Sequence, residues 1–157
     1  MPADIAQPIG HVQHRPDGPA VLLTPEYTRA LHGLAGFSHA IVLWWADKVD
    51  DPELRTRTEL DGPYAGGPDT LGVFATRSPV RPNPIGLSVP RILGVADDLL
   101  RVDWLDAEDG TPVLDIKPYS PSVDRPAHPV VPDWAAGWPG TIEESADFDW
   151  SHVLRHV

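Results

Sequence analysis

Arg77, Arg81 and Asn83 lie in a short segment, 77–84, that also contains three prolines. A guanidinium presents a planar fork of donors that suits a carboxylate or a phosphate, and the asparagine amide adds both a donor and an acceptor. Proline fixes φ, so a loop of this composition loses little entropy when it closes on a ligand. The segment is therefore predicted to be an irregular, stiff loop that binds an anion.

This loop reverses the sign of the charge around it. The chain of 157 residues has 12 Lys plus Arg and 23 Asp plus Glu, a formal charge of −11, yet no acidic residue lies between Val73 and Val95. The alternative is that both arginines pair with surface carboxylates, which would contribute only ~0–1 kcal/mol per pair. The net charge disfavours nucleic acid and anionic membranes as partners, because both bind through clustered Lys and Arg.

A second group of reactive side chains lies between residues 103 and 119. Asp106 or Asp109 could hold a ribose or an amine, although the sequence Asp-Gly-Thr-Pro from residue 109 is equally typical of a plain turn. Asp115 and Lys117 are two residues apart and would share one face of a strand, where a surface ion pair is the simpler interpretation. Tyr119 could orient a nucleophile.

Other candidates give weaker patterns. His152 and His156 are four residues apart and would share one face of a helix, but no third ligand is evident, so no metal site is predicted. Trp44 and Trp45 would point to opposite faces of a strand, one into the core and the other free to stack on an adenine or to pack at a dimer interface. The absence of cysteine excludes disulfides and thiolate catalysis.

The elements expected to position these residues are mostly strands. The 19 prolines favour short strands and rigid loops. Residues 24–26 (TPE) are typical of a helix start, and apolar residues at helical spacing follow as far as Gly33 or Gly36. A long loop is predicted at 47–67, and a hairpin around Asp109-Gly110. Strands are predicted at 9–13, 37–45, 72–75, 85–95, 99–105 and 113–116, with a helical turn at 132–136 and a terminal helix at 147–156.

The fold expected from these elements is mainly β: a small closed antiparallel β-barrel with one clear α-helix and peripheral short helices. A single domain over 1–157 is expected, with a core at about 9–139 and an acidic C-terminal segment at 140–157. No apolar run approaches the ~18 residues of a membrane span, and the first residues lack the features of a signal peptide. We therefore expect a cytoplasmic protein.

The two reactive segments read GVFATRSPVRPNPIG (72–86) and DGTPVLDIKPY (109–119), preceded by LAGFSH at 34–39 and by Ile9-Gly10. In this order they resemble the TsaA-like family, which includes the tRNA methyltransferase O group, over roughly residues 9–139. The resemblance implies a β-barrel that binds S-adenosylmethionine and works as a homodimer with the ligand near the subunit interface. The best-known members methylate the exocyclic nitrogen of threonylcarbamoyl-adenosine in tRNA.

The resemblance also implies roles for individual residues. Asp115, Lys117 and Tyr119 are the predicted catalytic residues, which would position the acceptor. Family members with a C-terminal extension carry a Pro-Arg-Gln segment soon after the first strand, whereas residues 13–19 here read QHRPDGP, with Gln13 and Arg15 as weak substitutes, and the extension is missing. The predicted cofactor-binding residues are Arg77, Arg81, Asn83, Leu87, Asp47, Lys48, Asp106, Ala107, Glu108 and Asp109.

Three functions are open at this point. The first is an S-adenosylmethionine-dependent methyltransferase that acts at nitrogen on a small molecule or a modified nucleoside. The second is the tRNA threonylcarbamoyl-adenosine N6-methyltransferase itself, which the acidic charge disfavours. The third is a non-catalytic S-adenosylmethionine-binding module, suggested by the shortened segment. Because a sulfonium already activates its methyl group, methyl transfer needs alignment and exclusion of water more than a strong base.

Overall fold

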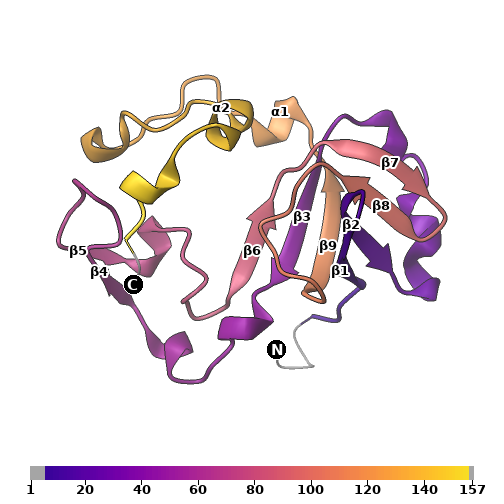
Figure 1. The fold of residues 1–157 in the computed structure, drawn as a ribbon, viewed down its shortest axis with the longest axis horizontal. Helices are drawn as coiled ribbons and strands as arrows, with labels where there is room; N and C mark the ends of the chain where they lie inside the picture. Colours follow the sequence, from indigo (N-terminus) through magenta and orange to yellow (C-terminus); the bar gives the residue numbers. More distant parts are fainter. Residues whose placement is uncertain (1–5, 156–157) are drawn as a thin grey trace.

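The computed structural model describes residues 6–155 and is mainly β (Figure 1). Seven strands form one antiparallel sheet in the order β6-β3-β9-β1-β2-β8-β7. β4 (Glu59–Asp61) and β5 (Thr70–Gly72) form a separate two-stranded ribbon. The strands of the large sheet are Gly10–Arg15 (β1), Gly18–Leu23 (β2), Ala40–Trp45 (β3), Ile85–Ser88 (β6), Ile92–Ala96 (β7), Leu99–Val102 (β8) and Pro112–Pro118 (β9).

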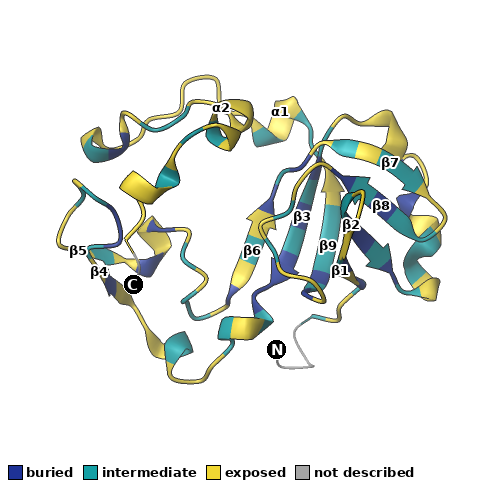
Figure 2. Ribbon diagram, viewed as in Figure 1, coloured by how far each residue is buried: buried dark blue, intermediate teal, exposed yellow. Residues whose placement is uncertain are grey.

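Period-two alternation along the strands separates a buried face from an outer face (Figure 2). Trp44 belongs to the buried face, where its indole N–H donates to the hydroxyl of Ser88 at 3.1 Å. Gly86 lies opposite Trp44 in the register, and a Cβ there would overlap the indole ring, so this position needs glycine. Five residues at the centre of the core have no exposed surface: Val12, Val42, Leu100, Val102 and Val113.

Closure of the sheet into a barrel, as expected from the sequence, is not detected. The sheet order ends at β6 and β7. An isolated bridge between His39 and Arg91 brings the chain before β7 beside the start of β3, and the amide of Ala40 donates to the carbonyl of Pro90 at 3.1 Å. Because Pro90 has no N–H, the ladder cannot run on unbroken from β6 into β7. The single strand predicted at 85–95 is divided at the same place.

The predicted α-helix after residue 24 is wrong. The chain forms 3₁₀ turns at Pro25–Leu31 and Leu34–Gly36, and Thr24 caps neither with its side chain. The hydroxyl of Thr28 bonds the carbonyl of Pro25 at 3.2 Å, a local bond that competes with helix formation, and Gly33 at φ 88° interrupts the segment. Within the described residues, the α-helices are the short Pro121–Asp124 (α1) and Ile142–Ala146 (α2).

The predicted hairpin around Asp109-Gly110 is also wrong. β8 pairs with β2 and β7, whereas β9 pairs with β1 and β3, so the intervening turn crosses between two parts of the sheet. By contrast, the turn at Asp17-Gly18 does join two paired strands, β1 and β2, with Gly18 at φ 114°. Residues 73–75 form a 3₁₀ turn in place of the predicted strand, and the predicted loop at 47–67 contains two such turns and β4.

A second, smaller body lies beside the sheet, built from β4, β5 and the C-terminal residues (Figure 1). The amide of Ala65 donates to the carbonyl of Val153 at 2.8 Å, and that of Arg155 donates to Pro63 at 3.0 Å. The predicted turn near residue 133 is confirmed as Asp133–Ala135, but the predicted terminal helix reduces to Trp150–His152, with His156 outside the described residues. No helix within residues 6–155 is long and apolar enough to cross a membrane.

Candidate functional site

The segment 77–84 is irregular, as predicted, and Arg81 holds it together. Its guanidinium donates to three main-chain carbonyls, those of Val73 (3.3 Å), Thr76 (3.4 Å) and Ser78 (3.4 Å), and lies 6.0 Å from the ring of Phe74. Arg81 therefore organises the loop internally. Its donors are directed at the protein more than at a ligand.

Arg55 clamps the other end of the loop, a role that the sequence analysis missed. Its Nε donates to the carbonyl of Pro82 at 2.9 Å and its Nη2 to Oδ1 of Asn83 at 3.3 Å. The same guanidinium pairs with Asp50 at 3.3 Å and lies 5.6 Å from the ring of Trp45. The signal was a basic residue inside the long segment 47–67, but nothing in the sequence gave its distance from residue 82.

Trp45 is unavailable for the stacking role considered for it. The side chain is 4% exposed, and its indole N–H donates to Asp50 at 2.8 Å. With the guanidinium of Arg55 over the ring, neither an adenine nor a second subunit reaches it. Trp44 is the core tryptophan of the predicted pair, but the stacking or interface role predicted for the other one is wrong, because Trp45 is buried as well.

Arg77 is exposed and keeps its guanidinium free. Within residues 6–155 this guanidinium makes no hydrogen bond or ion pair, while the main-chain N–H of Arg77 donates to the hydroxyl of Tyr64 at 3.4 Å. Neither Arg77 nor Arg81 pairs with a described carboxylate, so the surface-pair alternative does not hold here. Of the two arginines in this loop, Arg77 is therefore the one whose guanidinium is not engaged by another described residue.

Strand β6 connects several of the predicted cofactor-binding residues. At its start, the amide of Ala46 bonds the carbonyl of Pro84 at 2.8 Å, which brings Asp47 and Lys48 beside the arginine loop. In its middle, Leu87 is 41% exposed. At its end, the amide of Asp106 approaches the hydroxyl of Ser88 at 3.4 Å.

Asp47 carries an unsatisfied acceptor at this place. Its Oδ2 pairs with Lys48 at 3.2 Å. Its Oδ1 is buried and has no hydrogen-bond partner in the part of the chain that the structure describes. A buried acceptor without a donor costs ~1–3 kcal/mol, so a rotation of the carboxylate that brought Oδ1 to a hydroxyl or ammonium group of a ligand would be favoured.

The turn at 106–109 packs on the end of β1. Oδ1 of Asp109 accepts the amide of His14 at 2.7 Å, and the His14 ring bonds the carbonyl of Ala107 at 3.0 Å. Asp106 and Glu108 remain exposed. One carboxylate oxygen of Asp109 thus bonds the main chain of β1. The end of that strand, where Nη1 of Arg15 donates to Oε1 of Gln13 at 3.1 Å, lies next to this turn.

The predicted catalytic residues follow the outer face of β9. Asp115 and Lys117 form an ion pair at 2.5 Å, and this hydrogen bond together with the charge of Asp115 raises the pKa of Lys117 above its usual range. Tyr119 meets the ring of His39 edge-on at 6.3 Å. Asp115 and Leu87 both pair with Leu43 and share one face, so they lie two strand spacings, about 10 Å, apart.

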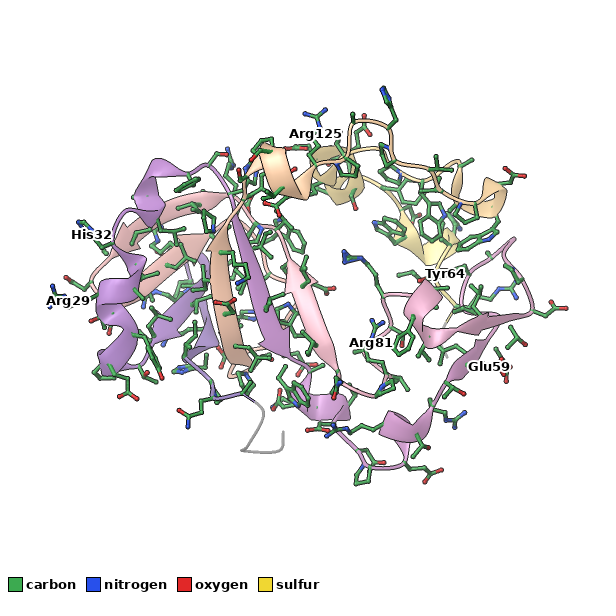
Figure 3. The ribbon with its side chains drawn as sticks, turned by 180° about the vertical axis from the view of Figure 1, so that it is seen from behind. Arg29, His32, Glu59, Tyr64, Arg81 and Arg125 are labelled. Atoms are coloured by element: carbon green, nitrogen blue, oxygen red, sulfur yellow. The ribbon has the colours of Figure 1, made fainter. Side chains whose placement is uncertain are left out.

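A pocket of about 380 Å³ lies elsewhere, between the sheet and the 3₁₀ turns of residues 25–36. Asp115 lines it, but no other predicted site residue does. Figure 3 shows His32, which also lines this pocket, on the opposite side of the molecule from Arg81. The chemistry assembled along β6 therefore lies outside this pocket.

The family model of the tRNA-methyltransferase O N-terminal domain matches residues 7–125. The chain belongs to this family. An S-adenosyl-L-methionine-binding protein of Archaeoglobus fulgidus is 47% identical over 104 residues, which cover 66% of this chain and 70% of that protein.

Solved structures of family members extend the comparison. A crystal structure of TrmO is 32% identical with a TM-score of 0.63, covering 80% of this chain and 62% of that one. The TrmO of Pseudomonas aeruginosa gives a TM-score of 0.61 at 32% identity, covering 80% of this chain and 60% of that one. The chain thus spans about three fifths of these two TrmO chains.

The candidate site brings together groups of complementary kinds. Among the described residues, the Arg77 guanidinium has no partner and Oδ1 of Asp47 has no donor, while Leu87 is an exposed apolar side chain on the connecting strand. Among the described residues, no group of three His, Cys, Asp or Glu could hold a metal ion. The arrangement suits a zwitterionic ligand with an apolar or aromatic part.

Proposed function

We propose that the chain binds S-adenosylmethionine along β6 and transfers its methyl group to a nitrogen of a small molecule or a modified nucleoside. The ligand carries a carboxylate that suits Arg77, hydroxyl and ammonium donors that suit Oδ1 of Asp47, and an aromatic ring that suits Leu87. The name of the A. fulgidus relative supports this choice of ligand. The single observation that carries the proposal is that the Arg77 guanidinium pairs with no residue between 6 and 155, in a protein of formal charge −11.

The chemistry asks little of an acid or a base. Bound S-adenosylmethionine supplies a methyl group already activated by its sulfonium. Lys117 cannot serve as a base near neutral pH, because Asp115 raises its pKa and keeps the ammonium protonated. Asp115, Lys117 and Tyr119 therefore orient the acceptor, and the deletion of one of them should lower kcat more than the affinity for the methyl donor.

The proposal is tested by titrating S-adenosylmethionine calorimetrically into the protein and into Arg77→Ala. A charge-assisted bond contributes ~1.5–3 kcal/mol, so the variant should bind about tenfold to a hundredfold more weakly. Arg29→Ala is the matched control, because Arg29 is also exposed but lies on the opposite side from the arginine loop (Figure 3). Equal affinity for Arg77→Ala and the unmodified protein would refute the assignment.

The tRNA methyltransferase is a second candidate, favoured by the matches to TrmO. The charge of −11 opposes it, because binding of a phosphate backbone depends on basic residues. Release of S-adenosylhomocysteine with tRNA, together with binding that weakens steeply with salt, would establish this candidate. If the protein binds S-adenosylmethionine but neither tRNA nor any small-molecule or nucleoside acceptor leads to release of S-adenosylhomocysteine, the protein is a non-catalytic S-adenosylmethionine-binding module.

We also propose that the chain is a homodimer that pairs along β6. This strand is at one end of the sheet order, carries no charged residue, and exposes Ile85 (43%) and Leu87 (41%). Natural sheets usually protect such an edge with charge or cover it. Light scattering should give twice the mass of 17.1 kDa, and Leu87→Lys should shift it toward the monomer; a monomeric unmodified protein would refute the dimer.

A further inference from the structure

Residues 126–155, here called the C-terminal brace, lie outside the matched family model, which ends at residue 125. Tryptophans of this brace surround the side chain of Tyr64, in the segment between β4 and β5. Tyr64 is 8% exposed, stacks on Trp134 at 5.3 Å with an interplanar angle of 18°, and meets Trp138 edge-on at 5.0 Å. Trp150 extends the cluster by packing on Trp138 at 5.6 Å.

The buried ring of Tyr64 reaches the predicted cofactor site. Its hydroxyl accepts the main-chain N–H of Arg77, at the N-terminal end of the arginine loop. The C-terminal end of that loop is held separately, by Arg55 on Pro82 and Asn83. Figure 3 shows Tyr64 and Arg81 on the same side of the molecule. The brace is thus linked to Arg77 through a single hydroxyl.

We propose that the C-terminal brace positions Arg77 through Tyr64 and so sets the affinity of the cofactor site, with Tyr64 as a positioning residue. A guanidinium on an unrestrained loop would lose conformational entropy on binding, whereas a restrained main chain has already lost it. Two tryptophan rings fix the orientation of the Tyr64 ring and therefore the place of its hydroxyl. This inference rests on the proposed function, because it assigns the anion at Arg77 to S-adenosylmethionine.

The test is calorimetric titration of S-adenosylmethionine into Tyr64→Phe, Trp138→Ala and Trp138→Phe. Tyr64→Phe removes one hydrogen bond and should weaken binding about threefold to tenfold. Trp138→Ala should weaken it at least as much, and Trp138→Phe should restore most of the affinity. Val130→Ser, at a 94% exposed position of the brace, should bind like the unmodified protein. Thermal unfolding followed by tryptophan fluorescence verifies that each variant is folded.

A double-mutant cycle separates positioning from simple support of the fold. In an Arg77→Ala background, Tyr64→Phe should have no further effect on affinity, because the guanidinium that Tyr64 is proposed to position is absent. Equal losses in both backgrounds would overturn the inference, as would unchanged affinity in Tyr64→Phe and Trp138→Ala. If the unmodified protein binds S-adenosylmethionine and the Tyr64 and Trp138 variants bind it with the same affinity, the proposed function stands and only the role of the C-terminal brace is refuted. If the unmodified protein does not bind S-adenosylmethionine, both proposals fall.

Discussion

Arg55 joins four features of the site at once, so its replacement should affect both stability and the order of the arginine loop. Its hydrogen bond to Pro82 at 2.9 Å comes from a charged donor, a class that contributes ~1.5–3 kcal/mol. The bond to Asn83 and the pair with Asp50, both at 3.3 Å, are longer and weaker, and the contact with Trp45 adds ~0.5–1 kcal/mol. We expect Arg55→Ala to lower the free energy of unfolding by about 2–4 kcal/mol.

Urea unfolding followed by tryptophan fluorescence measures this loss, and amide hydrogen exchange over residues 78–84 reports the order of the loop. Arg55→Lys keeps the charge but not the planar fork, so it should recover only part of the stability. Arg57→Ala, two residues along and exposed, should stay within ~0.5 kcal/mol of the unmodified protein. If Arg55→Ala has the same free energy of unfolding as Arg57→Ala and the same amide hydrogen exchange over residues 78–84 as the unmodified protein, Arg55 does not hold the loop.

Two further predictions concern the sheet. Gly86→Ala places a Cβ against the indole of Trp44 and should lower the free energy of unfolding by ~1–3 kcal/mol or more. Gly94→Ala is the control, because a Cβ there meets nothing within 4 Å, and it should lower the free energy of unfolding by less than ~1 kcal/mol. Equal losses for the two variants in urea unfolding would contradict the packing of Gly86 on Trp44. Because Asp115 raises the pKa of Lys117 above 10.5, their pair stabilises the fold at pH values below 10.5 and loses that effect as the pH rises through the higher folded value. An NMR titration that shows Lys117 losing its proton below pH 10.5 would contradict this assignment.

Local patterns in the sequence predicted part of the fold. Proline at positions 79, 82 and 84 excludes a regular element, and the loop there is irregular. The helical turn predicted at 132–136 depends on residues that are close in the chain, and a 3₁₀ turn forms at Asp133–Ala135. Residues 25–36 misled because helix periodicity does not distinguish an α-helix from 3₁₀ turns, in which the hydroxyl of Thr28 and the geometry of Gly33 favour the shorter bonds.

Strand pairing was less predictable, since it depends on contacts between residues distant in the chain. The chain does turn at Asp109-Gly110, but there Asp109 accepts a hydrogen bond from the amide of His14. The strand that follows, β9, pairs with β1 and β3 and not with β8. The same limit applies to Arg55, whose spacing from Asn83 gives no sign of their contact at 3.3 Å.

Residue chemistry and order along the chain therefore indicated the anion-binding loop, the mainly β fold and the TsaA-like family, because each depends on side-chain type or on short spacing. The roles of the individual groups came from the fold. Arg81 serves the loop and Arg77 is left for a ligand because the carbonyls of residues 73, 76 and 78 converge on Arg81. Oδ1 of Asp47 lacks a donor among residues 6–155, and burial separates it from water. Each of these depends on which groups folding brings within hydrogen-bond distance, and spacing along the chain does not encode that.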